Sequence, residues 1–377
     1  MRGSPPKSTP TTDRPTIYDV ARRSRLSPAT VSKVLRGVTT VSSENTRRVT
    51  DAVSALGYRR DPLAANLRRN RRALIGLIVP DFKNPFFGAL VAAIEGLAEA
   101  SGYRLVAVST SENIEREISQ VEALLDWRVG GLILVPCTDE LESAGRVRSE
   151  SVPAVVLDRV PKASPFDGIG VNNADACGAM VRHFYGLGHR QLFVAATTPK
   201  FQNMAERLDG IRHSVASLPE PMDIEIMFCG TDLESASRSM AVRFAQGPLP
   251  KAVFTLFNQG TLAALREIGV RNLDIPRDIS IAGFDDFEWM QVMHPPVATV
   301  IQPVEELATR AFYRLIERIE QPGMPPVLEE LTCALEFRGS IGAPRPDIIR
   351  QQNSRSQSAI RALAGLSSKD RKQRAKT

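Results

Sequence analysis

The sequence predicts an α/β protein in which an N-terminal all-α helix-turn-helix head precedes a two-lobed body of doubly wound parallel sheets. Two short helical patterns joined by a turn occupy residues 16–36. From residue 73 onward, apolar runs of strand length alternate with helical patterns, as expected for parallel strands joined by helices. This alternation restarts after residue 172, which predicts two lobes with a cleft between them.

Length and composition agree with this class. A chain of 377 residues with 43% hydrophobic and 24% charged side chains can form two or three globular domains. No apolar run approaches the roughly 18 residues that span a bilayer, and residues 1–15 lack the apolar stretch of a secretory signal. We expect this Pro-, Ser- and Thr-rich extension to be disordered. The four cysteines lack metal-ligand spacing, which indicates reduced core thiols in a cytoplasmic protein and no metal site.

Charge is distributed unevenly along the chain. Residues 1–72 hold 16 Lys or Arg against 5 Asp or Glu, and residues 344–377 hold 9 against 2. The remaining residues are acidic, with 23 Lys or Arg against 35 Asp or Glu. A basic head on an acidic body is typical of a head that binds a polyanion. The basic tail, 344–377, is expected to be disordered.

The head begins with two capped helices. Thr16 can cap the first helix with Asp19 reaching back to it, and Ser27 followed by Pro28 suits the start of the second. Both helices have a small apolar face, formed by Ile17, Val20 and Ala21 and by Val31, Val34 and Leu35. Two short helices at a tight turn predict a helix-turn-helix, whose second helix enters the DNA major groove. The alternative is an ordinary helical hairpin with a solvated basic face.

The outer face of the second helix carries groups that hold phosphates. These hydroxyls and cations are Ser27, Thr30, Ser32, Lys33 and Arg36. Pro28 and Ala29 lie at the exposed N-terminal end, where base edges are read. Because neither side chain can donate a hydrogen bond, we expect apolar contact there, for example with a thymine methyl group.

A third helix and a linker complete the predicted head. Ser43 is the expected cap of the third helix, Gly57 ends it, and the domain therefore spans 16–57. In the linker, 58–72, Asp61 and Pro62 resemble a helix start, and six arginines repel one another until phosphates neutralise them. We therefore expect the linker to become a hinge helix on DNA, the alternative being a plain basic linker.

The sequence of the body predicts two α/β units. In the first, strands are expected at ALIGLIVP, RLVAVST, GGLILVP and PAVVLD, with helices at 86–101 and 114–127. In the second, strands are expected at QLFVAAT, DIEIMFC, AVFTLF and ISIAGFDD, with helices near 174–187, 204–217, 234–246 and 260–269. Continuous apolar strands of this kind are typical of parallel sheets covered on both faces.

Four polar residues directly follow predicted strands, and a fifth lies in the helix after a strand. Asp158 follows PAVVL, Asn258 follows AVFTLF, Asp285 follows ISIAGF, Arg207 lies in the helix after QLFVAAT, and Gln302 follows ATVI. Ligands of open parallel sheets bind beyond the carboxyl ends of strands, so these groups predict a site for a polyhydroxylated or acidic small molecule. The alternative is that each residue caps a helix or turn.

Catalytic and metal-binding patterns are not found. The sequence contains no GxSxG, GxxxxGK[ST] or HExxH, and GIGVNNADA (168–176) lacks the spacing of a dinucleotide-binding loop. Asp285 and Asp286 are adjacent, but no third hard ligand accompanies them, which favours a turn or ligand role over a metal. We therefore expect no enzyme activity and no cofactor.

The ordered motifs TIYDVARRS, SPATVSKVL, LGYRRDPLAANL, IGLIVPDFKNPFF, GGLILVP, VVLDR, GLGHRQ, ERLDGI and ISIAGFDD give the chain its resemblance to a family. Over residues 16–340 it resembles the lactose-repressor/galactose-repressor (LacI/GalR) family of bacterial transcription regulators. The resemblance implies a cytoplasmic homodimer, nucleoid-associated when bound to pseudo-palindromic double-stranded operator DNA. It implies a repressor of carbohydrate or sugar-acid catabolism genes, controlled by a sugar, sugar acid or polyol in the interlobe cleft.

The resemblance also assigns residues and boundaries. The implied DNA contacts are Thr16, Tyr18, Ser27, Pro28, Ala29, Thr30, Ser32, Lys33, Arg36, Asn66 and Leu67, the last as a minor-groove wedge. The implied effector contacts are Phe82, Phe86, Phe87, Asp158, Arg207, Asn258, Asp285 and Gln302, with core packing as the alternative for the phenylalanines. The body, 73–343, resembles a periplasmic binding protein, with lobe 1 at about 73–172 plus 303–330 and lobe 2 at about 173–302 plus 331–343.

Three positions depart from the family pattern. Arg25 stands where the turn usually has Gly, so a positive φ there would strain the backbone by about 1 kcal/mol or more. Gln259 stands where Asp is usual, and Arg60 where Pro is usual. Two other functions remain as alternatives: a solute-binding protein, and a sugar- or nucleoside-processing enzyme that uses Asp158 and Asp285 as acid and base.

Overall fold

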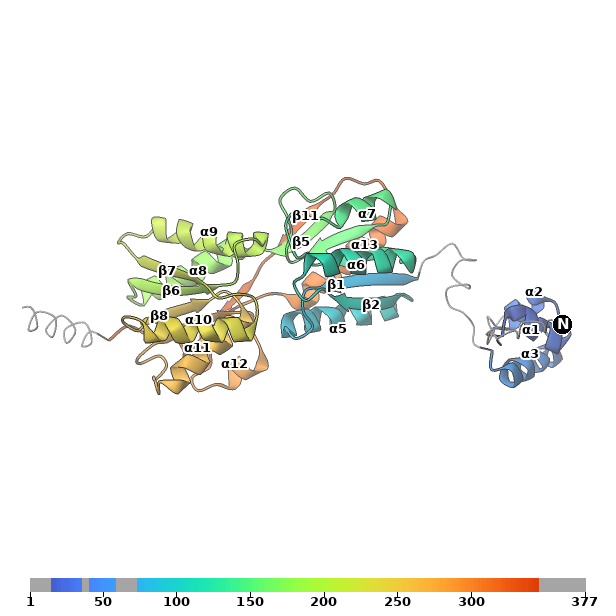
Figure 1. Ribbon diagram of the computed structural model, residues 1–377, viewed down its shortest axis with the longest axis horizontal. Coiled ribbons are helices and arrows are strands. Elements are labelled where there is room, and N and C mark those ends of the chain that lie inside the picture. The colour runs from blue at the N-terminus through green and yellow to red at the C-terminus, as the bar shows by residue number, and fades with distance from the viewer. Residues whose placement is uncertain (1–14, 36–40, 59–72, 346–377) are drawn as a thin grey trace, which may run out of the picture. The chain divides into compact units, whose positions relative to one another are not determined.

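The computed structural model describes residues 15–35, 41–58 and 73–345, which form a three-helix head and a larger two-lobed body (Figure 1). The head belongs to a compact unit that ends at Arg72, and the body to one that begins at Ala73. Within these ranges no helix has the length and apolar character needed to cross a membrane.

The head contains α1 (Ile17–Ser24), α2 (Pro28–Leu35) and α3 (Ser43–Leu56). The predicted capping box of α1 is confirmed, because the Asp19 carboxylate accepts the Thr16 backbone N–H at 2.9 Å and its hydroxyl at 2.6 Å. The cap of α2 is also confirmed, since Ser27 Oγ accepts the Thr30 N–H at 3.1 Å.

The predicted cap of α3 was wrong by one residue. Ser42, not Ser43, is the N-cap, and its hydroxyl accepts the Asn45 N–H at 3.4 Å. Two adjacent serines are equivalent in sequence, and only the one whose side chain reaches the N–H three residues on can serve as the cap. Gly57 ends α3 with a φ of 61°, as predicted.

The turn between α1 and α2 is held by α3. Arg25 lies in the left-handed region with φ 52°, at the position where the sequence suggested a strained residue. Arg48 of α3 donates from Nη2 to the carbonyl oxygen of Ser24 at 2.6 Å. Below the turn, Val20, Val31 and Val49 are fully buried, so each helix contributes one residue to the centre of the head.

Lobe 1 is a six-stranded parallel sheet in the order β11-β5-β4-β3-β1-β2. The strands are β1 (Leu74–Val79), β2 (Arg104–Ser109), β3 (Gly131–Leu134), β4 (Ala154–Leu157), β5 (Asp167–Val171) and β11 (Leu328–Leu331). Helices α5 (Pro85–Ala100) and α13 (Val304–Glu320) cover one face, and α6 (Ile114–Asp126) and α7 (Ala144–Ser149) cover the other.

Lobe 2 repeats this arrangement in the order β12-β10-β9-β8-β6-β7. The strands are β6 (Gln191–Ala196), β7 (Asp223–Phe228), β8 (Ala252–Thr255), β9 (Ser280–Phe284), β10 (Ala298–Ile301) and β12 (Ala334–Glu336). Helices α8 (Asn173–Gly186) and α9 (Gln202–Ala216) lie on one face, and α10 (Leu233–Ala245) and α11 (Asn258–Val270) on the other. The short α12 (Glu288–Val292) follows β9. Unlike the predicted all-parallel sheet, β12 pairs antiparallel with β10.

The chain passes between the two sheets after β5, after β10 and after β11. As a result α13 and β11, which come late in the sequence, lie beside the early elements of lobe 1 (Figure 1). Local sequence patterns did not predict β5, α7, α12, α13, β11 or β12. The segment 168–176, whose spacing does not fit a dinucleotide-binding loop, forms most of β5 and the start of α8.

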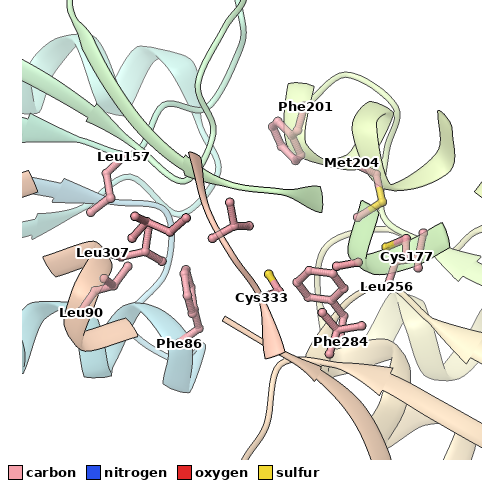
Figure 2. Close-up of a cluster of buried hydrophobic side chains, with 14 of the residues drawn as sticks. Phe86, Leu90, Leu157, Cys177, Phe201, Met204, Leu256, Phe284, Leu307 and Cys333 are labelled. Atoms are coloured by element: carbon pink, nitrogen blue, oxygen red, sulfur yellow. The ribbon is translucent and has the colours of Figure 1, made fainter. Parts of the chain in front are cut away.

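One apolar cluster extends through both lobes (Figure 2). From lobe 1 it includes Phe86 and Leu157, from lobe 2 Met204 and Phe284, and Cys333 lies between them on the passage from β11 to β12. Burial of apolar area is the main favourable term in folding. The two lobes therefore share part of the interaction that stabilises each of them.

The packing of α8 against α9 generates a first prediction. A methyl group added at Gly210 of α9 would lie 2.0 Å from the carbonyl oxygen of Ala174 in α8. Gly210→Ala should therefore destabilise the body by about 1–3 kcal/mol or more, because backbone must move. Urea unfolding followed by tryptophan fluorescence measures this in the full chain, since both tryptophans, Trp127 and Trp289, lie in the body.

Gly186→Ala is the matched control in α8. Nothing lies within 4 Å of a methyl group there, so this change should stabilise by about 0.5–1 kcal/mol. Equal unfolding midpoints for the two variants would contradict the close approach of α8 and α9.

Candidate functional site

The five polar residues predicted beyond the strand ends are all buried in the body. The exposed fractions are 5% for Asp158, 5% for Arg207, 4% for Asn258, 8% for Asp285 and 5% for Gln302. Gln302 Nε2 donates to Asp285 Oδ1 at 2.7 Å, and Arg207 interacts electrostatically with both carboxylates. The structure therefore brings residues of both lobes into one polar group.

The two aspartates occupy equivalent places in the two lobes. Asp158 follows β4 and Asp285 follows β9, the strands that hold the same position in their sheets. Both have left-handed backbone, with φ 66° and 72°, and each donates its N–H at 2.9 Å to the next strand, to Ile169 and Val300 respectively. A left-handed conformation costs a residue other than glycine about 1–3 kcal/mol. The backbone hydrogen bonds to the neighbouring strands keep both aspartates in this conformation.

Arg207 is fixed on three sides. Its Nε donates to Asn173 Oδ1 at 2.8 Å, and its Nη1 donates to the carbonyl oxygen of Leu256 at 2.7 Å. The guanidinium carbon lies 3.5 Å from the ring centroid of Phe284, which is a cation–π contact. The arginine thus joins α8, α9 and the ends of β8 and β9.

Three buried oxygens at this place have no hydrogen-bond donor within the described ranges. They are Asp158 Oδ1, Asn258 Oδ1 and Gln302 Oε1. A buried acceptor without a partner costs about 1–3 kcal/mol, and native proteins rarely keep several together. A molecule with several hydrogen-bond donors would satisfy such oxygens.

Burial also changes the protonation of the carboxylates. It raises the pKa of Asp285 to about 6, while the nearby Arg207 cation and the Gln302 amide act in the opposite direction. Burial likewise raises the pKa of Asp158, against the attraction of Arg207 and Arg159. Arg207 and Arg159 thus both attract Asp158, but Arg159 is already paired with Glu112 through contacts of 2.8 and 2.7 Å.

Asp286 does not join the site. It forms a bidentate ion pair with Arg338, with contacts of 2.6 and 2.7 Å, and also accepts from Gln291. The adjacent aspartates therefore have separate partners. Among the residues that the structure describes, no group of three or more His, Cys, Asp or Glu side chains could hold a metal ion.

The three phenylalanines assigned to the effector differ in their surroundings. Phe86 and Phe87 are 4% exposed and pack edge to face, with ring centroids 5.2 Å apart. Both belong to the shared apolar cluster, which is the packing role left open by the sequence. Phe82 is half-exposed in the loop after β1.

Sequence reasoning missed two asparagines at the site. Asn203 Nδ2 donates to Asp158 Oδ2 at 3.3 Å, and Asn173 accepts from Arg207. Asn203 precedes Arg207 by four residues on a predicted helix, so helical spacing could have placed the two side chains on one face. Asn173 comes from a neighbouring helix, and no local pattern indicates its contact.

In the head, the predicted DNA-contacting residues are accessible. Thr16, Tyr18, Ser27, Ala29 and Lys33 are exposed, and Pro28, Thr30 and Ser32 are partly exposed. Tyr18 is a large aromatic side chain with 61% of its surface accessible. Arg36, Asn66 and Leu67 lie outside the described residues, as do 1–14 of the extension, 59–72 of the linker and 346–377 of the tail.

Comparison with protein families gives two matches. Residues 16–61 match the model for bacterial regulatory proteins of the lacI family, and residues 181–341 match a periplasmic binding protein-like domain. The chain is 32% identical over 332 residues to the ribose operon repressor of Escherichia coli K12, covering 86% of this chain and 99% of that protein. It is 29% identical to the HTH-type transcriptional regulator PtxS of Pseudomonas aeruginosa, covering 88% and 97% respectively.

A solved structure shares the fold over nearly the same length. The Lac repressor dimer bound to operator and the anti-inducer ONPF is 26% identical, with a TM-score of 0.75. The match covers 88% of this chain and all of that chain. The predicted fold, a helix-turn-helix head with a body like that of periplasmic binding proteins, is therefore confirmed.

The raised pKa of Asp285 predicts how stability depends on pH. Because the folded pKa of about 6 exceeds the ordinary 3.8, the folded chain binds more protons between these values. Protonation of Asp285 therefore stabilises the folded chain below pH 4, and this stabilisation is lost as the pH rises through 6. Asp285→Asn cannot ionise, and asparagine tolerates the left-handed backbone. The variant should be more stable than wild type at pH 7, by up to about 3 kcal/mol, and the difference should vanish at pH 4.

Urea unfolding of both proteins at pH 4, 5, 6 and 7 measures this difference. Asp209→Asn is the control, because Asp209 is exposed on α9 and pairs only with Arg212 of the same helix among the described residues. A difference between Asp285→Asn and wild type that is the same at every pH would contradict the assignment.

Proposed function

Because this chain belongs to the lacI family of bacterial regulatory proteins, we propose that it represses genes of carbohydrate catabolism and is controlled by a neutral polyhydroxylated effector. It is a DNA-binding transcription regulator and not an enzyme. The observation that carries the effector proposal is that Asp158, Asn258 and Gln302 each have a buried acceptor oxygen without a hydrogen-bond partner in the body.

The proposed DNA interface is the exposed face of α2 with Thr16 and Tyr18. Hydroxyl and cationic side chains there can bind phosphates, while Pro28 and Ala29 offer apolar contact to bases. Two heads of a homodimer would read two half-sites of an operator, with centres one helical turn or a multiple of it apart. The basic composition of residues 1–72 supports this assignment.

The chemistry of the site favours a neutral effector over a sugar acid. Arg207 already donates to Asn173 and Leu256 and stacks on Phe284, so its contacts are largely made within the protein. The other nearby cation, Arg159, is paired with Glu112, so both arginines already have partners within the protein and a ligand carboxylate would meet Asp158 and Asp285. The unpartnered oxygens on Asp158, Asn258 and Gln302 require donors, which hydroxyl groups supply.

The proposed control follows from the position of the site between the lobes. Asp158 comes from lobe 1, whereas Arg207, Asn258 and Asp285 come from lobe 2. A ligand that bridges them favours one arrangement of the lobes over another. If operator binding favours a particular arrangement, then effector and operator must change each other's affinity by the same factor.

A thermal-shift panel tests the effector class. The full chain would be heated with neutral pentoses, hexoses, disaccharides and polyols, including ribose, and in parallel with the corresponding aldonic and uronic acids. A neutral effector at about 100 times its Kd adds roughly 2.7 kcal/mol and should raise Tm by a few degrees, whereas the acids should not. A shift obtained only with sugar acids would overturn the charge argument.

Arg207→Ala tests whether this site controls DNA binding. An operator would first be selected from random duplexes, and its release would be followed by fluorescence anisotropy as the active sugar is added. Because the change leaves two buried carboxylates without this cation, the melting curve of the variant is measured first. Below its Tm the variant should bind operator as wild type does, but its operator affinity should not change when sugar is added, because the guanidinium that organises the site is lost.

Arg212→Ala is the matched control on the same helix. Arg212 is exposed and pairs with Asp209 within α9, so this variant should respond like wild type. An Arg207→Ala protein that responds at the same sugar concentration as wild type would remove Arg207 from the site.

A further inference from the structure

Helix α9 of lobe 2 begins without a cap of its own. Its N-cap residue, Phe201, has no side-chain acceptor, and the first N–H groups of a helix have no partner within it. The Gln202 N–H instead donates to Asp139 Oδ1 at 3.0 Å. Asp139 lies in lobe 1, in the loop after β3, and a carboxylate at a helix N-terminus also interacts favourably with the helix dipole. The start of α9 is therefore completed by the opposite lobe.

The residues on either side of Gln202 also contact lobe 1. The Arg159 guanidinium carbon lies 3.9 Å from the ring centroid of Phe201, and Glu112 holds that guanidinium through two contacts of 2.8 and 2.7 Å. Asn203 donates to Asp158 Oδ2 at 3.3 Å. Three consecutive residues of lobe 2 thus each bind a different side chain of lobe 1.

A hydrogen-bonded chain connects this first turn with Arg207. Gln202 Nε2 donates to Glu206 Oε1 at 2.8 Å, and Asn173 Nδ2 donates to Glu206 Oε2 at 3.0 Å. Asn173 in turn accepts from Arg207 Nε at 2.8 Å. A displacement of residues 201–203 would therefore move the groups that orient the arginine.

We propose that residues 201–203 form a latch between the lobes, in which Asp139 and Asn203 are positioning residues that act on Arg207 through α9. Asp158 gives one carboxylate oxygen to this latch, and its other oxygen is buried without a partner. A molecule that binds this second oxygen contacts the same carboxylate that Asn203 binds. The latch stands on the contacts alone, and only its link to an effector rests on the proposed function.

Asp139→Ala tests the latch in the full chain without ligand or DNA. One readout is amide hydrogen exchange at the first turn of α9, and the other is alkylation of Cys333 by iodoacetamide, both resolved by peptide mass spectrometry. Cys333 is a suitable reporter because it is 6% exposed and lies where the chain passes from β11 to β12. Both rates should rise by roughly fivefold or more, while exchange in β1 and β6 stays unchanged.

Three further variants make the result specific. Asn203→Ala should reproduce the effect, because it removes a second contact of the same turn. Asp139→Asn keeps an acceptor oxygen and should retain most of the protection. Asp209→Ala removes an exposed α9 carboxylate that pairs with Arg212 in the same helix and should match wild type.

Two results would overturn the latch. One is unchanged exchange and alkylation in both Asp139→Ala and Asn203→Ala. The other is equal acceleration in β1 and β6, which would show loss of overall stability instead of release of this turn. Since no ligand is used, either outcome is independent of whether any sugar binds, so the latch and the proposed function can fail separately.

Discussion

The body depends on one electrostatic constraint, which is that two buried carboxylates from different lobes share one buried arginine. Buried charges are stable only when they are paired and hydrogen-bonded. Asp158 and Asp285 both interact electrostatically with Arg207, and Arg207 is in turn held by Asn173, Leu256 and Phe284. Separating the lobes would leave Asp158 without this cation, so the charges favour keeping the lobes together.

This constraint is built on an internal repeat. The two sheets have the same strand order, and the strand that precedes each aspartate has the same place in both. The repeat includes the backbone hydrogen bond that each aspartate donates to the next strand. It does not include the residue that follows each aspartate. Arg159 in lobe 1 pairs with Glu112, whereas Asp286 in lobe 2 pairs with Arg338. The repeated backbone thus supplies the site, and the different neighbours supply the contacts peculiar to each lobe.

The sequence predicted the fold and the polar residues at the strand ends because both follow from local patterns. Apolar runs that alternate with helices specify a parallel sheet, and such a sheet gathers the carboxyl ends of its strands at one edge. It did not predict Asn173, or the contacts of Asp139 and Arg159 with the start of α9, because these partners are 34 to 63 residues apart and meet only through tertiary packing. The N-cap of α3 was predicted one residue too late because two serines are adjacent there. Helix α13 was missed although its apolar positions have helical spacing, because it follows a passage between the sheets.

The late position of α13 and β11 has a consequence for how the chain folds during synthesis. Chains emerge from the ribosome N-terminus first, and domains fold as units once their residues are available. The head needs only the first 58 residues and can form early. Lobe 1, in contrast, must wait for residues 304–331 to cover β3 and β4 and to pair with β5, although its first strand is made before any residue of lobe 2. Throughout synthesis of lobe 2, the apolar face that α13 later buries therefore remains without this cover.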